Sequence, residues 1–450
     1  MNDAEKSDGG ESPSANDSYA VLRNRDFRLY ITGRLISVLG SQMLSVAVGW
    51  EIYERTHSAL KLGFVGLSEM LAMLIFTLPA GHVADNFSRK RIIETVLLLT
   101  SLASLGLAVI SWLEAPVIWV YACLFIFAAA RTFLWPASAA FVTSLVPRKI
   151  FSRAVMWNSG MFQLASVVGP ALGGALIALL HDRVSHPAAV IYAINMLTAL
   201  SCFTLVTMVR SQHVVTKREP MTPKNLIAGF RFVFSNRIIL GTITLDMFAV
   251  FLGGATALLP VFAKDILKYG PSGLGILQAA LPIGAVTCSL FLAHRPPMQK
   301  AGRSLLWAVA AFGVATILFG VLNEPTLGWL TGNAIHGAVW FWLAFAMLFT
   351  CGAVDNISVI VRQTLVQILT PDEKRGRVSA VNSLFIGTSN EFGGFESGVV
   401  AHWFGPMIGN TIATGAIISV VSGGVGTILV VIAVALIWPE IRKYGRLDAH

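Results

Sequence analysis

Long apolar runs separated by short polar connections dominate this chain. A helix needs about 20 apolar residues to cross a bilayer, and twelve runs are long enough to do so. They occupy residues 28–53, 60–82, 92–113, 117–140, 153–180, 188–209, 238–263, 273–294, 304–323, 339–368, 377–404 and 411–438. A weaker run at residues 325–338 is expected at the surface. The pattern predicts an all-α polytopic membrane protein with twelve transmembrane helices.

Composition and charge agree with this prediction. The 450 residues are 55% hydrophobic and 13% charged, which is too apolar for a soluble protein of this size. The net charge of +9 could suggest nucleic-acid binding, but about 25 of the 33 Lys and Arg residues lie in the tails and in every second connection. Because positive residues stay on the cytosolic side, we expect both termini in the cytosol, and topology explains the basicity without nucleic acid.

The chain also repeats itself. A shift of 224 residues places Leu145, Pro147 and Arg153 on Leu369, Pro371 and Arg377, and it extends to three further identities. A weaker match at a shift of 212 pairs Asn24-Arg25 with Asn236-Arg237 and Leu62-Gly63 with Leu274-Gly275. The two matches predict two pseudo-symmetric six-helix bundles around a central site. We expect an N-terminal tail at 1–27, bundles at 28–210 and 238–438, a linker with an amphipathic helix at 211–237, and a C-terminal tail at 439–450.

The same shifts relate charged residues inside the predicted helices. Arg34 corresponds to Asp246, and Arg131 corresponds to Asp355. A charge at mid-bilayer costs about 2.5–3.5 kcal/mol on insertion scales, so these side chains should avoid lipid. We expect the four to face a common chamber between the bundles. The alternative is that they form fixed interhelical ion pairs.

Further charged residues accompany these four. Glu69, Glu391 and Glu396 could carry protons, because an apolar site favours the neutral form of a carboxyl group. They could equally be hydrogen-bonded contacts between helices. Arg362 lies seven residues after Asp355, on roughly the same helix face, and could simply neutralise it.

A short polar turn lies between the second and third apolar runs. Gly81 is expected to supply a tight bend there, and Asp85 to cap the next helix. Arg89, Lys90 and Arg91 would stay in the cytosol. The spacing resembles the loop between helices 2 and 3 of the major facilitator superfamily, which implies a cytosolic gate. The alternative is an ordinary cytosolic turn.

A second motif lies in the fifth run. Gly169, Gly173 and Gly174 would let two helices approach closely, and Pro170 would introduce a bend. The motif resembles the span-five signature of major facilitator antiporters that export their substrates. A generic small-residue packing face remains the alternative.

Longer stretches resemble the enterobactin exporter-like family, also called transmembrane secretion effectors. These stretches are residues 33–37, 49–56, 245–250, 257–265, 355–364 and 375–382. The resemblance spans the chain from Asp26 to about Trp403. It implies a twelve-helix major facilitator fold and an exporter in a bacterial inner membrane.

These observations predict a proton-coupled exporter of a small organic molecule, a siderophore or an amphipathic drug, working by alternating access. Asp246 or Asp355 would be protonated in one state and ion-paired with Arg34 or Arg131 in the other. No Walker loop is present, so the proton motive force replaces ATP. We expect a monomer with no cofactor. The four Cys lie inside predicted spans without metal-ligand spacing, so we expect no metal site. The sequence shows no Ser/His/Asp or nucleophile-elbow arrangement with suitable spacing, so we expect no enzymatic site. The alternatives are a lysophospholipid flippase of the same fold, and a non-transporting sensor or scaffold.

Overall fold

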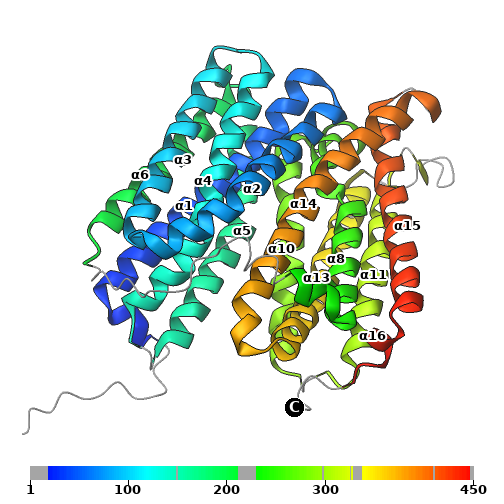
Figure 1. Cartoon of the computed structure of the whole chain (residues 1–450). Coiled ribbons are helices and arrows are strands. Elements are labelled where there is room, and N and C mark those ends of the chain that lie inside the picture. Colours follow the sequence, from blue (N-terminus) through cyan, green and yellow to red (C-terminus); the bar gives the residue numbers. More distant parts are fainter. Residues whose placement is uncertain are drawn as a thin grey trace, which may run out of the picture.

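The structure is a computed structural model that describes residues 19–147, 150–210, 230–295, 298–324, 326–327, 337–408 and 411–445. Most of the expected amphipathic linker helix and of the weak run at 325–338 lies outside these residues. The described part is helical throughout and forms two bundles that lie side by side (Figure 1). The start of the first long helix and the C-terminal end lie at the same end of the molecule. We call this the terminal end, and the opposite end the far end.

The N-terminal half comprises η1 (Ala20–Arg23), α1 (Arg25–Thr56), α2 (Ala59–Asn86), α3 (Arg89–Trp112), α4 (Val117–Leu145), α5 (Phe151–His181) and α6 (Pro187–Thr207). The C-terminal half comprises α8 (Arg237–Leu252), η3 (Ala255–Leu258), α9 (Leu259–Val261), η4 (Phe262–Ile266), α10 (Gly270–Ala293), α11 (Ala301–Val321), α13 (Gly337–Leu369), α14 (Asp372–Ile408), α15 (Ile412–Ile437) and α16 (Pro439–Lys443).

Within the described residues, 11 helical segments are long and apolar enough to cross a membrane. The 37-residue helix α14 is not among them. It carries Glu391 and Glu396, and it packs against α2, α8 and α15 as part of the C-terminal bundle. With α14, the described chain has the long helices of a twelve-helix polytopic membrane protein.

The two halves repeat the same local structure. Asn24 caps α1 by accepting hydrogen bonds from the backbone amides of Asp26 and Phe27. Asn236 caps α8 in the same way, at the two amides that follow Arg237. The helix contacts repeat as well, because α1 packs on α5 and α6 as α8 packs on α14 and α15. The internal repeat of the sequence is therefore a structural repeat.

Two glycine pairs join the halves at symmetric positions. A Cβ atom on Gly174 of α5 would lie 2.9 Å from Cα of Gly275 on α10, and one on Gly398 of α14 would lie 2.8 Å from Cα of Gly63 on α2. Gly63 and Gly275 are 212 residues apart, and Gly174 and Gly398 are 224 apart, which are the two shifts of the repeat. Glycine is needed here because the helix backbones touch.

The prediction of a tight bend at Gly81 is wrong. Helix α2 continues through Gly81 and Asp85 and ends at Asn86. A glycine inside a helix needs no special conformation, and glycine is frequent in membrane-spanning helices. The N-cap residue of the next helix is Ser88, whose side chain accepts a hydrogen bond from the backbone amide of Arg91, and the backbone of Asp85 belongs to α2.

The seventh expected span, residues 238–263, is not one continuous helix. Helix α8 ends at Leu252, the chain passes Gly253 and Gly254, and short helical turns continue to Ile266. The last of these turns is a π-helix, Phe262–Ile266. Irregular backbone at membrane depth is tolerated where it is buried in protein. This segment meets that condition, since residues 258–263 are almost fully buried.

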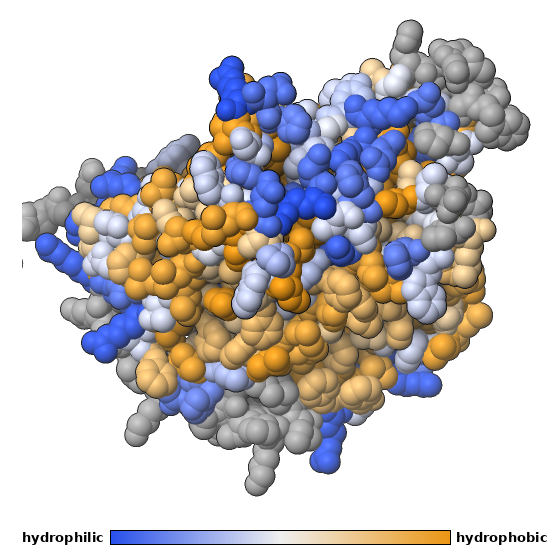
Figure 2. Space-filling view, turned by 90° about the horizontal axis from the view of Figure 1, so that it is seen from above, coloured by the Kyte–Doolittle hydropathy of each residue, from blue (hydrophilic) through white to orange (hydrophobic). Residues whose placement is uncertain are grey.

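Figure 2 views the molecule from the far end. Hydrophilic residues gather in the centre and upper part of this view, and hydrophobic residues spread broadly to the sides and below. The outer faces of the bundles carry many exposed apolar side chains, among them Leu102, Ile118, Trp307 and Leu436. A surface of this kind suits contact with lipid.

Candidate functional site

An ion network joins the two halves near the middle of the molecule. Arg131 of α4 donates from Nη2 to Oε2 of Glu69 on α2, at 2.9 Å. The same nitrogen lies 3.6 Å from Oε1 of Glu391 on α14. We call these three residues the central network. Two of them belong to the N-terminal half and one to the C-terminal half, so the network depends on how the halves are positioned.

Close backbone packing holds this network in place. A Cβ atom on Gly66 of α2 would clash with the backbone oxygen of Glu391. Helices α2 and α14 therefore touch at the level of the network. The side chain of Arg131 is nevertheless 48% exposed, and no partner of its Nε or Nη1 lies within the described chain. The guanidinium group combines two carboxylate contacts with free hydrogen-bond donors.

A second charged site lies inside the C-terminal half. Asp246 of α8 forms an ion pair with Arg362 of α13, and their side chains are only 8% and 3% exposed. Asp246 and Asp355 also line a small pocket with Ser358 and with residues of α8 and α11. Asp355 has no hydrogen bond or ion pair in the described part of the chain. One of the two carboxylates is therefore neutralised by a cation and the other is not.

Arg34 lies apart from both sites. Its Nη1 donates to the hydroxyl of Tyr30 at 3.3 Å, within α1. Its Nε is buried without an acceptor in the described chain. No carboxylate lies within ion-pair distance of Arg34 among the described residues.

The expected common chamber of four charges therefore needs correction. Arg131 lies at the boundary between the halves, whereas Asp246 and Asp355 line a pocket bounded by helices of the C-terminal half alone. Asp246 pairs with Arg362 and not with Arg34, and Arg131 pairs with two glutamates and not with Asp355. Arg362 neutralises Asp246, although its spacing suggested Asp355. These ion pairs depend on which helices pack against each other, and the internal repeat of the sequence does not predict them.

A cluster of polar contacts closes the far end. Lys264 Nζ of η4 lies 2.7 Å from Oε2 of Glu54 on α1. It also lies 6.0 Å from the ring centroid of Trp50 and 5.9 Å from that of Tyr53. The hydroxyl of Tyr53 donates to Asp265. These five residues, which we call the far-end cluster, join the two halves at a second level.

The cluster falls in two stretches, residues 49–56 and 257–265, that resemble the enterobactin exporter-like family, but the sequence does not relate its members to one another. Its members are separated by about 210 residues, and no spacing along the chain relates them. A usable signal was present, because aromatic and charged residues alternate in Trp50-Glu51-Ile52-Tyr53-Glu54. Glu51 does not join the cluster, since it accepts from Tyr192 at 2.7 Å and pairs with Arg55.

The glycine motif of α5 packs on two different helices. Cβ atoms on Gly169 and Gly173 would meet Gln42 and Met43 of α1, within the same half. Gly174 meets α10 of the other half, at Pro271 and Gly275. Pro170 lies inside α5. The motif therefore allows close helix approach, as expected, and one of its glycines contributes to the seam between the halves.

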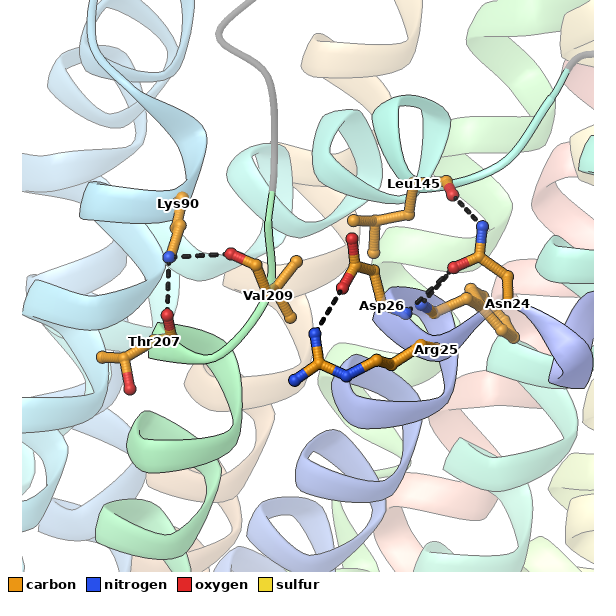
Figure 3. A network of polar contacts seen from close by, with 8 residues as sticks. Asn24, Arg25, Asp26, Lys90, Leu145, Thr207 and Val209 are labelled. Atoms are coloured by element: carbon orange, nitrogen blue, oxygen red, sulfur yellow. Dashed lines mark hydrogen bonds and ion pairs between the residues drawn. The ribbon is translucent and has the colours of Figure 1, made fainter.

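The basic residues after α2 hold helices of the N-terminal half together. Arg89 donates to the backbone oxygen of Ala140 at 3.0 Å. Lys90 donates to the oxygens of Thr207 and Val209 at 2.8 and 2.9 Å, at the end of α6 (Figure 3). Their hydrogen bonds in the described chain all stay within that half. The side chain of Asp85 lies outside the described part, and Arg91 is exposed.

The comparisons with known proteins identify the family. The model of the Major Facilitator Superfamily matches residues 30–394. The chain belongs to this superfamily. Such proteins are membrane transporters, not enzymes. Within the described residues, no group of three or more His, Cys, Asp or Glu side chains that could hold a metal ion occurs.

This major facilitator protein is similar over most of its length to enterobactin exporters. It is 24% identical over 428 residues to the enterobactin exporter EntS of Shigella flexneri, covering 93% of each chain. It is 25% identical over 433 residues to EntS of Salmonella choleraesuis, again covering 93% of both.

Solved structures show the same fold at low sequence identity. The inward-facing, occupied bacterial homologue of the human lysosomal transporter Spinster has a TM-score of 0.69 at 14% identity, covering 93% of this chain and 97% of that one. The D-xylose–proton symporter has a TM-score of 0.67 at 14% identity, covering 92% and 100%. The major facilitator fold implied by the family resemblance is confirmed.

Proposed function

We propose that this major facilitator protein is a proton-coupled exporter of a small organic molecule in a bacterial inner membrane, working by alternating access. The observation that carries the proposal is the central network, in which Glu391 of one half shares Arg131 with Glu69 of the other. A charge pair that crosses the moving boundary contributes differently to the two conformations. Protonation of Glu391 removes this contribution, which couples proton binding to conformation.

The contacts between the halves agree with a cycle of this kind. The far-end cluster and the two glycine pairs hold the halves together toward the far end. If the positive-inside pattern puts the terminal end in the cytosol, this conformation receives its substrate from the cytosol. Export then requires the far-end contacts to open and the cytosolic side to close.

The coupling residues are part of the proposal. Glu391 is the proton carrier that the geometry supports best, because its only cation in the described chain belongs to the other half. Asp355 is the second candidate, because it lines the small pocket and has no cation of its own in the described chain. Asp246 is paired with Arg362 and is a weaker candidate. Arg34 remains available to a ligand.

The test uses inside-out membrane vesicles that contain the protein. Enterobactin serves as the siderophore probe, ethidium as the amphipathic drug, and a fluorescent lysophospholipid as the flippase probe. The proposal expects uptake of enterobactin or ethidium that collapses when a protonophore is added. Transfer of the lysophospholipid alone would favour the flippase, and no movement of any probe would favour a sensor or scaffold.

A variant separates coupling from transport. Glu391→Gln is expected to abolish accumulation against a gradient while downhill movement of the same probe continues. Asp355→Asn is the comparison. Full proton-driven accumulation by Glu391→Gln, together with its loss in Asp355→Asn, would overturn the assignment of Glu391 and leave export intact.

A further inference from the structure

One tryptophan on α4 occupies an unusual position. Trp135 follows Arg131 by four residues, so the two side chains lie about 40° apart around the helix axis and one turn apart along it. The same face of α4 carries Leu124, Ala128 and Val142, which are buried to 4% exposure or less. Trp135 therefore lies on the inward face of its helix, the face from which Arg131 reaches Glu391 of the other half, and its side chain is 70% exposed.

Exposed apolar side chains near the start of α4 point away from Trp135. Ile118 lies about 100° from Trp135 around the axis, and Ile126 lies about 180° from it. Trp119 is also exposed and lies about 160° from Trp135. An exposed side chain on the inward face borders the space between the two halves. Because α4 runs from the far end to the terminal end, Trp135 is one turn on the terminal side of the central network.

We propose that Trp135 is a stacking platform for a planar aromatic, cationic group of the transported molecule. This inference rests on the proposed transport function and names its substrate class. An indole face gives a large area for stacking on a flat ring, and among aromatic side chains it attracts cations best. No cation–π contact to Trp135 occurs in the described chain, so its face is available.

The sign of the charge follows from the neighbouring network. Glu69 and Glu391 supply two carboxylates, while Arg131 supplies one guanidinium group. When all three are ionised, the network carries one net negative charge, which attracts a cationic ligand and repels an anionic one. A proton on Glu391 removes that charge, so proton and cation compete, as exchange of one for the other requires.

The first experiment tests where Trp135 points and is independent of transport. The four native Cys are replaced, and Trp135→Cys or Ile126→Cys is introduced. Inside-out vesicles are then treated with a membrane-impermeant cationic methanethiosulfonate. We expect rapid labelling at 135 and at least about tenfold slower labelling at 126. Equal rates at both positions would overturn the placement of Trp135 in the space between the halves.

The second experiment tests the ligand class by protection of the cysteine at position 135 from labelling. Ethidium is the planar aromatic cation, tetrabutylammonium the non-aromatic cation, and 2,3-dihydroxybenzoate the aromatic anion. We expect ethidium alone to protect. Equal protection by tetrabutylammonium would overturn stacking, and protection by the anion would overturn the sign of the charge.

Binding to the purified protein completes the test. Ethidium affinity is expected to fall about 3- to 10-fold in Trp135→Ala, from the strength of aromatic and cation–π contacts, and to recover partly in Trp135→Phe. Trp119→Ala is the matched control on the opposite face and should bind like the parent. An equal loss in both alanine variants would contradict a specific platform. Proton-driven export of enterobactin with no binding of ethidium would refute this inference while supporting the proposed function.

Discussion

The far-end cluster permits a quantitative prediction about conformational equilibrium. In Lys264→Gln, the side chain keeps most of its length but loses its charge. The ion pair with Glu54 is partly exposed, at 23% and 41%, which is typically worth about 0.2–1 kcal/mol. The contacts of Lys264 with the rings of Trp50 and Tyr53 add about 0.5–1 kcal/mol.

The variant therefore destabilises the closed far end by about 1–2 kcal/mol. Since 1.4 kcal/mol corresponds to a factor of ten in an equilibrium constant, the ratio of open to closed molecules should rise about 5- to 30-fold. The Tyr53–Asp265 hydrogen bond and the glycine pairs remain, so the protein should stay folded. Both conformations should be detectable in the variant.

Spin labels at Lys61 of α2 and His402 of α14 provide the assay, because both residues are exposed and lie on helices that face each other across the far end. Double electron–electron resonance should show a larger long-distance population in Lys264→Gln. Lys268→Gln is the control, because Lys268 is exposed nearby and has no partner in the described chain. An unchanged distance distribution, or the same change in the control, would refute the reasoning.

Three further predictions concern the seam and the buried charges. Gly174→Leu should prevent α5 from packing on α10 and should lower far-end closure in the same spin-label assay, whereas Gly160→Leu, at a glycine with open space around it, should not. Asp246→Asn should strongly lower the melting temperature of the detergent-solubilised protein, because removing one partner of a buried ion pair costs about 3–5 kcal/mol. Adding Arg362→Met should recover much of the lost stability, and failure to recover it would argue against the pair. Glu391→Gln should remove the difference in spin-label distances between pH 6 and pH 8, and a persistent difference would mean that another group carries the proton.

The fold could be predicted from the sequence because each half encodes the same local instructions. Asn24 and Asn236 cap corresponding helices, and the spacing of Gly63 and Gly275 reflects the same packing requirement. Hydropathy alone placed most of the helices within a few residues, but it did not predict that the seventh span is interrupted after Leu252. The sequence also predicted a bend at Gly81, where the helix in fact continues. The helical turns on both sides of Gly81 already fix the backbone there.

The candidate site was predicted less well. Periodicity placed Arg362 and Asp355 on one face of α13, but the partner of Arg362 comes from α8, and only the packing of the two helices decides it. The contact of Glu391 with Arg131 depends on the position of one half relative to the other. The sequence identified the charged residues that avoid lipid, because the cost of placing a charge in the bilayer depends only on the residue and its position in a span. It could not assign their partners, because partners are a property of the assembled bundle.

The interruption of the seventh span has a mechanical consequence. Asp246 lies on the terminal side of Gly253 and Gly254, while Lys264 and Asp265 lie on their far-end side. A continuous helix would transmit a rotation at one end of the span to the other end. An interrupted segment lets η4 move while α8 stays fixed by the ion pair between Asp246 and Arg362. The far end can therefore open without breaking this buried ion pair of the C-terminal bundle.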